Sequence, residues 1–188
     1  MKKTELVYRR ILQEAESNRK KLTQAGIARD LGVSLSTVNH ALHPLRKMGA
    51  VSVSLRSFSV VDTKKILMLW ASIRNIEKDV IYATRAEMAA KDIEKTMPST
   101  VVFAAYSAYR LAFKEAPADY SEVYVYGDGE EVKKRFPPKA GPPNVFVLEK
   151  HFDKMTKTQM FTDLWNLREW YAKDYLNALE RRLDAILA

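Results

Sequence analysis

The stretch QAGIARDLGVSLSTVNHALH, residues 24–43, constrains the fold of this chain more than any other segment. Ile27, Ala28 and Leu31 have the spacing of residues on one buried side of a helix. Gly32 follows them, and glycine adopts the left-handed backbone of a tight turn without the strain that a Cβ causes. The pattern predicts a short helix that ends in a sharp turn, with a small alanine where a second helix crosses it.

A second helix is predicted directly after the turn. Its inner face consists of Val38, Ala41, Leu42 and Leu45, which again recur at helical spacing. Thr23 can cap the first helix, and Ser34 or Ser36 can cap the second. The outer face carries short or medium polar side chains with hydrogen-bonding tips, namely Ser34, Ser36, Thr37, Asn39, His40 and His43.

Over its full length the stretch resembles the helix-turn-helix motif of phage repressors and Cro, because its Ala, Gly and Val residues fall at the spacing of that motif. In that motif the second helix enters the major groove and hydrogen-bonds base edges. We therefore predict base contacts from Ser34, Ser36, Thr37, Asn39, His40 and His43. A helical hairpin that never touches DNA is the alternative interpretation.

Positive charge is concentrated in the same region. The net charge is +8; residues 1–62 hold 11 lysines and arginines against five acids, and residues 63–188 hold 20 against 18. A local basic excess is what attraction to phosphates requires, although a basic chain can also simply be well solvated. We predict contacts with the DNA backbone from Lys20, Lys21, Arg46, Lys47 and Arg56.

A hairpin is predicted after the helices. In AVSVSLRSFSVVD, residues 50–62, apolar residues up to Leu55 alternate with serines, and the alternation resumes at Phe58. Alternation with a period of two predicts half-buried strands with a tight tip around Leu55 to Ser57 and Arg56 exposed there. Three helices followed by a hairpin make a winged helix-turn-helix, whose wing tip lies along the DNA backbone or minor groove. A solvated turn charge is the alternative role for Arg56.

The segments beside the motif have simpler patterns. Residues 4–16 predict an amphipathic helix, and residues 18–21 predict a solvated connector. Pro44 would clash with the carbonyl of His40 inside a regular helix, so we expect a bend there and a helix end at Gly49.

The remaining two thirds of the chain predict a second, mixed α+β domain. We expect helices at 63–77, 84–95, 106–113, 130–136 and 168–187. We expect strands at 101–103, 121–126, 144–150 and 158–166. The last helix has an apolar stripe of Ala172, Leu176, Leu179, Leu183 and Ile186. Most of the many aromatic residues of this half are expected in its core.

No residue pattern indicates catalysis, a cofactor or a metal. The chain has no cysteine, and His40 and His43 have no third ligand near them in sequence. AYSAYRLAF…DYSEVYVY has the layout of a small nucleotidyltransferase, in which two carboxylates hold Mg²⁺. In that layout a Gly-Ser turn also begins a helix. Here Tyr106 stands in place of the glycine and Tyr124 in place of the second acid, and Glu122 alone cannot hold the metal. At most, we expect a degenerate scaffold that binds a ligand or a protein.

Composition also bears on the compartment. No apolar run approaches the ~20 residues that a membrane span needs, and the first residues have no signal-peptide core. The lack of cysteine suits a reducing cytosol. We expect a cytoplasmic protein that does not associate with membranes.

Three segments together resemble a known family. They are VSLSTVNHALHPLRKMGAV at 33–51, ADYSEVYVY at 118–126 and FTDLWNLREWYAKDYLNALERRL at 161–183. Their order is similar to that of archaeal AbiEi-type proteins, the antitoxins and autoregulators of type IV toxin–antitoxin systems. The resemblance implies a winged-helix repressor of its own operon, a C-terminal domain needed for antitoxicity and a nucleotidyltransferase-like toxin encoded nearby.

These observations predict an α+β protein with a winged helix-turn-helix at 1–62, a linker or packing helix at 63–77 and an α+β regulatory or antitoxin-like domain at 78–188. We expect a sequence-specific transcriptional regulator that binds double-stranded DNA. A homodimer is expected because two-fold operators require two recognition helices about one DNA turn (~34 Å) apart. The dimer contact is expected at the 63–77 helix or the terminal helix.

Overall fold

The computed structural model describes residues 1–187 of the chain, and the side chains of residues 1–183. Two compact units emerge: residues 1–74 with the end of the last helix from Arg182, and residues 75–181. Among the described helices, none is both long enough and apolar enough to cross a bilayer.

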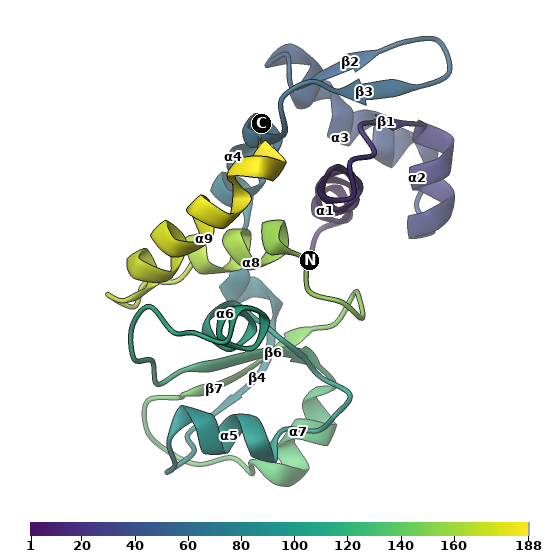
Figure 1. The fold of residues 1–188 in the computed structure, drawn as a ribbon. Coiled ribbons are helices and arrows are strands. Elements are labelled where there is room, and N and C mark those ends of the chain that lie inside the picture. Colours follow the sequence, from purple (N-terminus) through teal and green to yellow (C-terminus); the bar gives the residue numbers. More distant parts are fainter. Residues whose placement is uncertain (188) are drawn as a thin grey trace. The chain divides into compact units, whose positions relative to one another are not determined.

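The first unit is a winged helix-turn-helix. Its helices are α1 (Lys3–Glu16), α2 (Gln24–Leu31), α3 (Leu35–Lys47) and α4 (Thr63–Ile73). Its strands are β1 (Lys21–Leu22), β2 (Val51–Val53) and β3 (Phe58–Val60), which form an antiparallel sheet in the order β1-β3-β2 (Figure 1). The inner faces of α1, α3 and the wing contribute fully buried apolar side chains, among them Ile11, Leu42 and Phe58.

The prediction of a solvated connector at 18–21 was wrong for its last residue. Lys21 and Leu22 form β1, and they pair with Ser59 and Phe58 of the wing. The two-residue strand was hidden in the sequence because its alternation is too short to register, and only the distant strand β3 completes its hydrogen bonds.

A buried charged pair joins α1 to the end of α4 within this unit. The carboxylate of Glu5 accepts hydrogen bonds from Trp70 Nε1 at 3.3 Å and from Arg74 Nη1 at 3.4 Å. The Glu5 and Arg74 side chains are only 4% and 0% exposed. Because an unpaired buried charge is costly, these contacts tie the two helices together.

The second unit surrounds a four-stranded sheet in the order β4-β7-β6-β5. Its strands are β4 (Val80–Thr84), β5 (Val102–Phe103), β6 (Val123–Gly127) and β7 (Val145–Glu149). Its helices are η1 (Ile76–Asp79), α5 (Ala90–Thr96), α6 (Ala105–Phe113), α7 (Gly129–Arg135), α8 (Lys157–Trp165) and the greater part of α9 (Ala172–Leu187). Strands β6 and β7 are parallel, whereas the outer strands pair antiparallel to them.

Both faces of this sheet are covered by helices. Figure 1 shows α5 and α7 on one face and α6 and α8 on the other. On β6, Val123 and Val125 belong to the apolar cluster formed with α5 and α7. Tyr124 and Tyr126, which alternate with them, hydrogen-bond to residues that follow or belong to α8. The alternation of valine and tyrosine along β6 thus separates an aliphatic core layer from a polar aromatic one.

Two predicted elements of this unit were wrong. The segment 158–166 is the helix α8 and not a strand, with Thr156 capping it by accepting the Gln159 amide at 3.1 Å. All residues from Thr158 to Leu164 are buried, so apolar spacing could not separate a helix from a strand. Thr84, expected to begin a helix, instead ends β4, where it pairs with Val145.

The terminal helix begins at Ala172, four residues later than Arg168, where it was predicted. Its predicted stripe is buried at Leu179 and Leu183, and the side chain of Ile186 lies outside the described residues.

Candidate nucleic-acid interface

The turn between α2 and α3 has the predicted construction. Thr23 Oγ1 accepts the Gly26 amide at 3.0 Å and so caps α2. Gly32 ends α2 in the left-handed conformation with φ +61°, and Val33 N then bonds back to Ala28 O at 3.0 Å. These bonds fix the angle at which α3 leaves the turn, because each satisfies a backbone group that the helix ends leave unpaired.

Ser34 caps α3 and thereby sets where the helix starts. Its hydroxyl accepts the Thr37 amide at 3.1 Å and lies 2.9 Å from the Thr37 hydroxyl. The predicted inner face of α3 is confirmed, since Val38, Ala41, Leu42 and Leu45 are all buried. The helix continues through Pro44 to Lys47 and ends where Gly49 adopts φ +69°, so the bend expected at Pro44 stays a prediction.

The outer face of α3 presents free polar groups. Ser36, Asn39, His40 and His43 are exposed, and no hydrogen bond or ion pair engages these side chains in the part of the chain that the structure describes. The hydroxyls of Ser34 and Thr37 are already bonded to each other at the cap. Four free side chains on a rigid helix suit base recognition, and base contact by all six residues stays a prediction.

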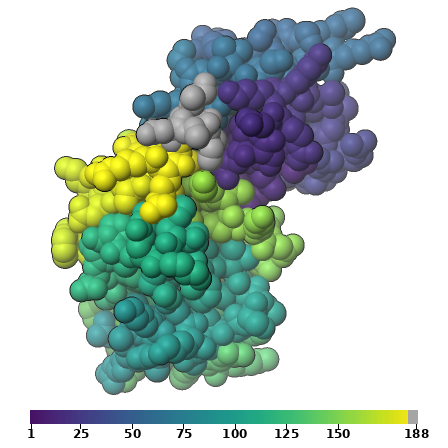
Figure 2. Space-filling view, in the orientation of Figure 1, coloured from purple at the N-terminus to yellow at the C-terminus, as the bar shows by residue number. Residues whose placement is uncertain are grey.

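The wing is closed by two serines. Ser54 N donates to Ser57 O at 2.8 Å, and Ser54 Oγ lies 3.0 Å from the same carbonyl and 2.9 Å from Ser57 Oγ. Leu55 lies at the tip, as predicted, and is 97% exposed. The serine contacts close the turn around Leu55 and Arg56. Arg56 is exposed beside it, and Figure 2 shows the blue wing projecting from the body of its unit.

The structure separates the cations of this unit into two groups. Arg10, Arg19 and Arg29 form ion pairs with Glu14 or Asp30, which neutralise them locally. The predicted phosphate contacts differ, because their side chains are exposed and make no ion pair or hydrogen bond within the described residues. They are Lys20, Lys21, Arg46, Lys47 and Arg56. Their charge is therefore available to a polyanion.

Pairing of β1 with the wing also positions two of these lysines. Val60 N donates to Lys20 O at 2.7 Å, and Lys21 pairs with Ser59. Lys20 and Lys21 are therefore held against the wing strand by backbone hydrogen bonds and do not belong to a loose connector. Because this backbone is already ordered, less conformational entropy is lost when the two lysines bind phosphates.

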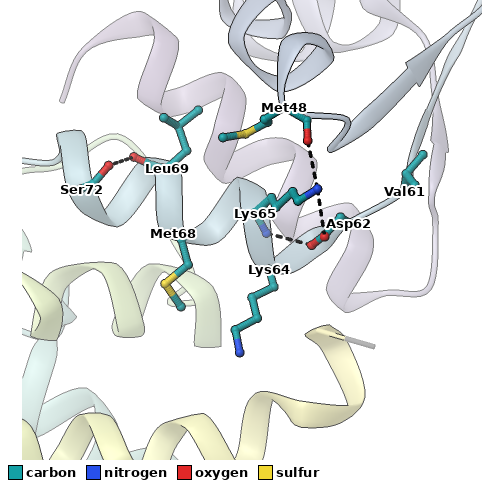
Figure 3. Close-up of a pocket in the computed structure, with 8 residues that line it drawn as sticks. All are labelled: Met48, Val61, Asp62, Lys64, Lys65, Met68, Leu69 and Ser72. Atoms are coloured by element: carbon teal, nitrogen blue, oxygen red, sulfur yellow. Dashed lines mark hydrogen bonds and ion pairs between the residues drawn. The ribbon is translucent and has the colours of Figure 1, made fainter.

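A hollow of ≈ 640 Å³ lies beside the end of α3 and was not foreseen from the sequence. It is lined by Met48, Val61, Asp62, Lys64, Lys65, Met68, Leu69 and Ser72. In Figure 3, Lys65 reaches Met48 O at 3.0 Å and approaches Asp62 at 3.8 Å. Lys64 extends in another direction and has no ion-pair partner within the described residues. The periodicity of α4 indicated a helix but gave no sign that its outer side borders a hollow.

In the second unit, the two tyrosines that stand at the glycine and second-acid positions of the nucleotidyltransferase layout serve the core. The hydroxyls of Tyr106 and Tyr124 donate to the two carboxylate oxygens of Glu169 at 3.1 and 2.9 Å. Burial raises the pKa of both tyrosines, and the Glu169 charge raises it further. Within the described residues, no three His, Asp or Glu side chains gather to hold a metal ion.

A second polar cluster lies on the same face of the sheet. The carboxylate of Asp163, fully buried on α8, lies 2.8 and 2.9 Å from the hydroxyl of Tyr126. Gln159 Nε2 donates to Asp163 Oδ1 at 2.9 Å and to the Tyr126 hydroxyl at 3.1 Å. These bonds satisfy a buried charge and fix α8 against β6.

Comparison with known proteins supports the first unit alone. A family model of winged helix-turn-helix DNA-binding domains matches residues 9–52, from α1 to the first strand of the wing. No curated protein and no solved structure matches the chain. The N-terminal domain thus has the winged helix-turn-helix fold and is similar in sequence to DNA-binding domains of this kind.

Proposed function

We propose that this protein is a transcriptional regulator that recognises a specific sequence in double-stranded DNA and represses the genes beside it. The observation that carries the proposal is α3, a capped helix with Ser36, Asn39, His40 and His43 exposed and free. The segment that contains it matches a DNA-binding family model. Such a domain favours a regulator over an enzyme, and we propose that it acts in the cytoplasm.

The proposal gives the two sets of residues different roles. Ser34, Ser36, Thr37, Asn39, His40 and His43 would read base edges, which differ between base pairs in the major groove. Lys20, Lys21, Arg46, Lys47 and Arg56 would contact phosphates, which carry no sequence information. What supports this division is the exposure of both sets apart from the half-buried Thr37, and the lack of acidic partners of the five cations within the described residues.

Paired variants test the division of roles. Asn39→Ala combined with His40→Ala should lower affinity for the preferred duplex by about 1–3 kcal/mol per lost base contact and leave random duplex almost unaffected. Arg56→Ala should weaken both duplexes alike. Lys134→Ala, which removes an exposed cation of α7 in the other unit, is the matched control. Unchanged binding in both test variants would defeat the assignment.

We also propose a homodimer whose contact includes the hollow beside α4. Two-fold operators need two recognition helices, and a two-fold contact must be complementary to itself. The hollow offers exposed apolar side chains such as Met48 and Val61 together with the unpaired Lys64 and the acidic Asp62. A surface with apolar area and both charges can face a copy of itself.

Light scattering after gel filtration tests the dimer. Met68→Glu, which places a charge in the hollow, should convert the dimer to a monomer. Ile73→Glu, exposed on the same helix outside the hollow, should leave the dimer intact. A monomeric wild type would overturn the homodimer, and a dimeric Met68→Glu would move its interface elsewhere.

The finer role that we propose is autoregulation as an AbiEi-type antitoxin, with a nucleotidyltransferase-like toxin encoded nearby. Its support is the resemblance of segments that lie in α3, in β6 and in α8 to α9. In this role, residues 1–62 would bind DNA, residues 63–77 would form a linker or packing helix, and residues 78–188 would form the antitoxin-like domain. Co-expression with the neighbouring gene should relieve growth arrest caused by that gene, and arrest that persists would remove the antitoxin role while leaving DNA binding intact.

A further inference from the structure

One apolar residue interrupts the polar outer face of α3. Leu35 is the first residue of the helix, and its side chain is 55% exposed. The core does not need it, since the inner face is already filled by Val38, Ala41, Leu42 and Leu45. A single exposed leucine is common on protein surfaces and carries no meaning alone. Leu35 is of interest because it lies in the first turn of the helix proposed to enter the major groove.

The first turn of a recognition helix is the part that reaches base edges in helix-turn-helix complexes. In this turn the hydroxyls of Ser34 and Thr37 are bonded to each other, so the cap already occupies them. Leu35 and Ser36 remain as the exposed, uncommitted side chains of the turn. Asn39 lies one helical turn further along, at i+4 from Leu35, on the same side of the helix.

Among the groups that bases present in the major groove, the thymine C5-methyl is the apolar one. An apolar side chain in the first turn therefore has one natural partner there. We propose that Leu35 selects thymine by packing against its C5-methyl group, next to the base pair that Asn39 contacts. This inference rests on the proposed function, because it requires α3 to enter the major groove.

Replacement of thymine by uracil tests the contact, because it removes the methyl group and keeps the base pair. A preferred duplex is first selected from a random library with the full-length protein, and each thymine is then changed to deoxyuridine in turn. One change per half-site should weaken wild-type binding about fourfold, which corresponds to the loss of one buried methyl-sized group. In Leu35→Ala the same change should have almost no effect.

Two further variants make the outcome specific. Leu55→Ala removes an exposed leucine from the wing tip and should keep the full uracil effect. Leu35→Met retains an apolar side chain at this position and should keep most of the uracil effect. A uracil effect of equal size in wild type and Leu35→Ala, or none at any thymine in the wild type, would overturn the role of Leu35 while DNA binding stands. Failure of the selection to enrich any sequence would overturn the proposed function itself.

Discussion

Ser34 and Thr37 fix the start of helix α3, since the Ser34 hydroxyl accepts the Thr37 amide at 3.1 Å. Ser34→Ala removes this cap and should lower the free energy of unfolding by about 1 kcal/mol. Ser36→Ala, two positions later on the exposed face, should change it by less than about 0.5 kcal/mol. Urea denaturation followed by circular dichroism compares them. Equal effects of the two substitutions would mean that the cap contributes nothing.

Glu5 should be essential to the stability of the first unit. Glu5→Ala leaves Arg74 buried without this carboxylate, and breaking a buried pair in this way costs about 3–5 kcal/mol. Lys3→Ala, an exposed change on the same helix, should have little effect. Thermal unfolding measures both. A Glu5→Ala protein as stable as the wild type would show that the buried pair does not hold α1 to α4.

The buried tyrosines of the second unit should make the protein sensitive to alkali. Burial and hydrogen bonding to Glu94 raise the pKa of Tyr120 to about 12, from an ordinary value of 10.0. The folded state then binds more protons than the unfolded state between these values. Stability should therefore be complete below pH 10 and fall as the pH rises from about 10 to about 12.

Absorbance at 295 nm, which reports tyrosinate, checks this alkaline transition against circular dichroism. Burial also raises the pKa of Tyr106, Tyr124 and Tyr175. Much of the absorbance change should therefore coincide with unfolding. Ionisation of nearly all nine tyrosines near pH 10 in a protein that stays folded would contradict the prediction.

The sequence predicted the first unit well because its signals are local. Thr23, Gly32 and Ser34 act within three or four residues of their partners, so spacing alone revealed them. Strand β1 was missed because Lys21 is held by Ser59, far away in the chain. The wing tip around Leu55 was predicted from the break in the alternation, whereas the contact between two serine side chains that closes it is visible only in the structure.

Sequence patterns were less informative in the second unit, where tertiary contacts dominate. The residues of α8 from Thr158 to Leu164 are all buried, so neither a helical nor a strand period distinguished them. One feature of the candidate interface, the exposure of the outer face of α3, could be predicted from helical periodicity. Two features required the three-dimensional structure: Ser34 and Thr37 bond to each other, and the five cations lack acidic partners among the side chains that it describes.

The most direct test of DNA recognition by α3 is the affinity of the wild-type protein for its selected duplex as a function of salt concentration. Five phosphate contacts per protomer predict that the logarithm of the binding constant falls linearly with the logarithm of salt, with a slope of about −4 to −5 for each bound protomer. Random duplex should bind much more weakly at every salt concentration. Binding that does not respond to salt, or equal affinity for the two duplexes, would contradict the account.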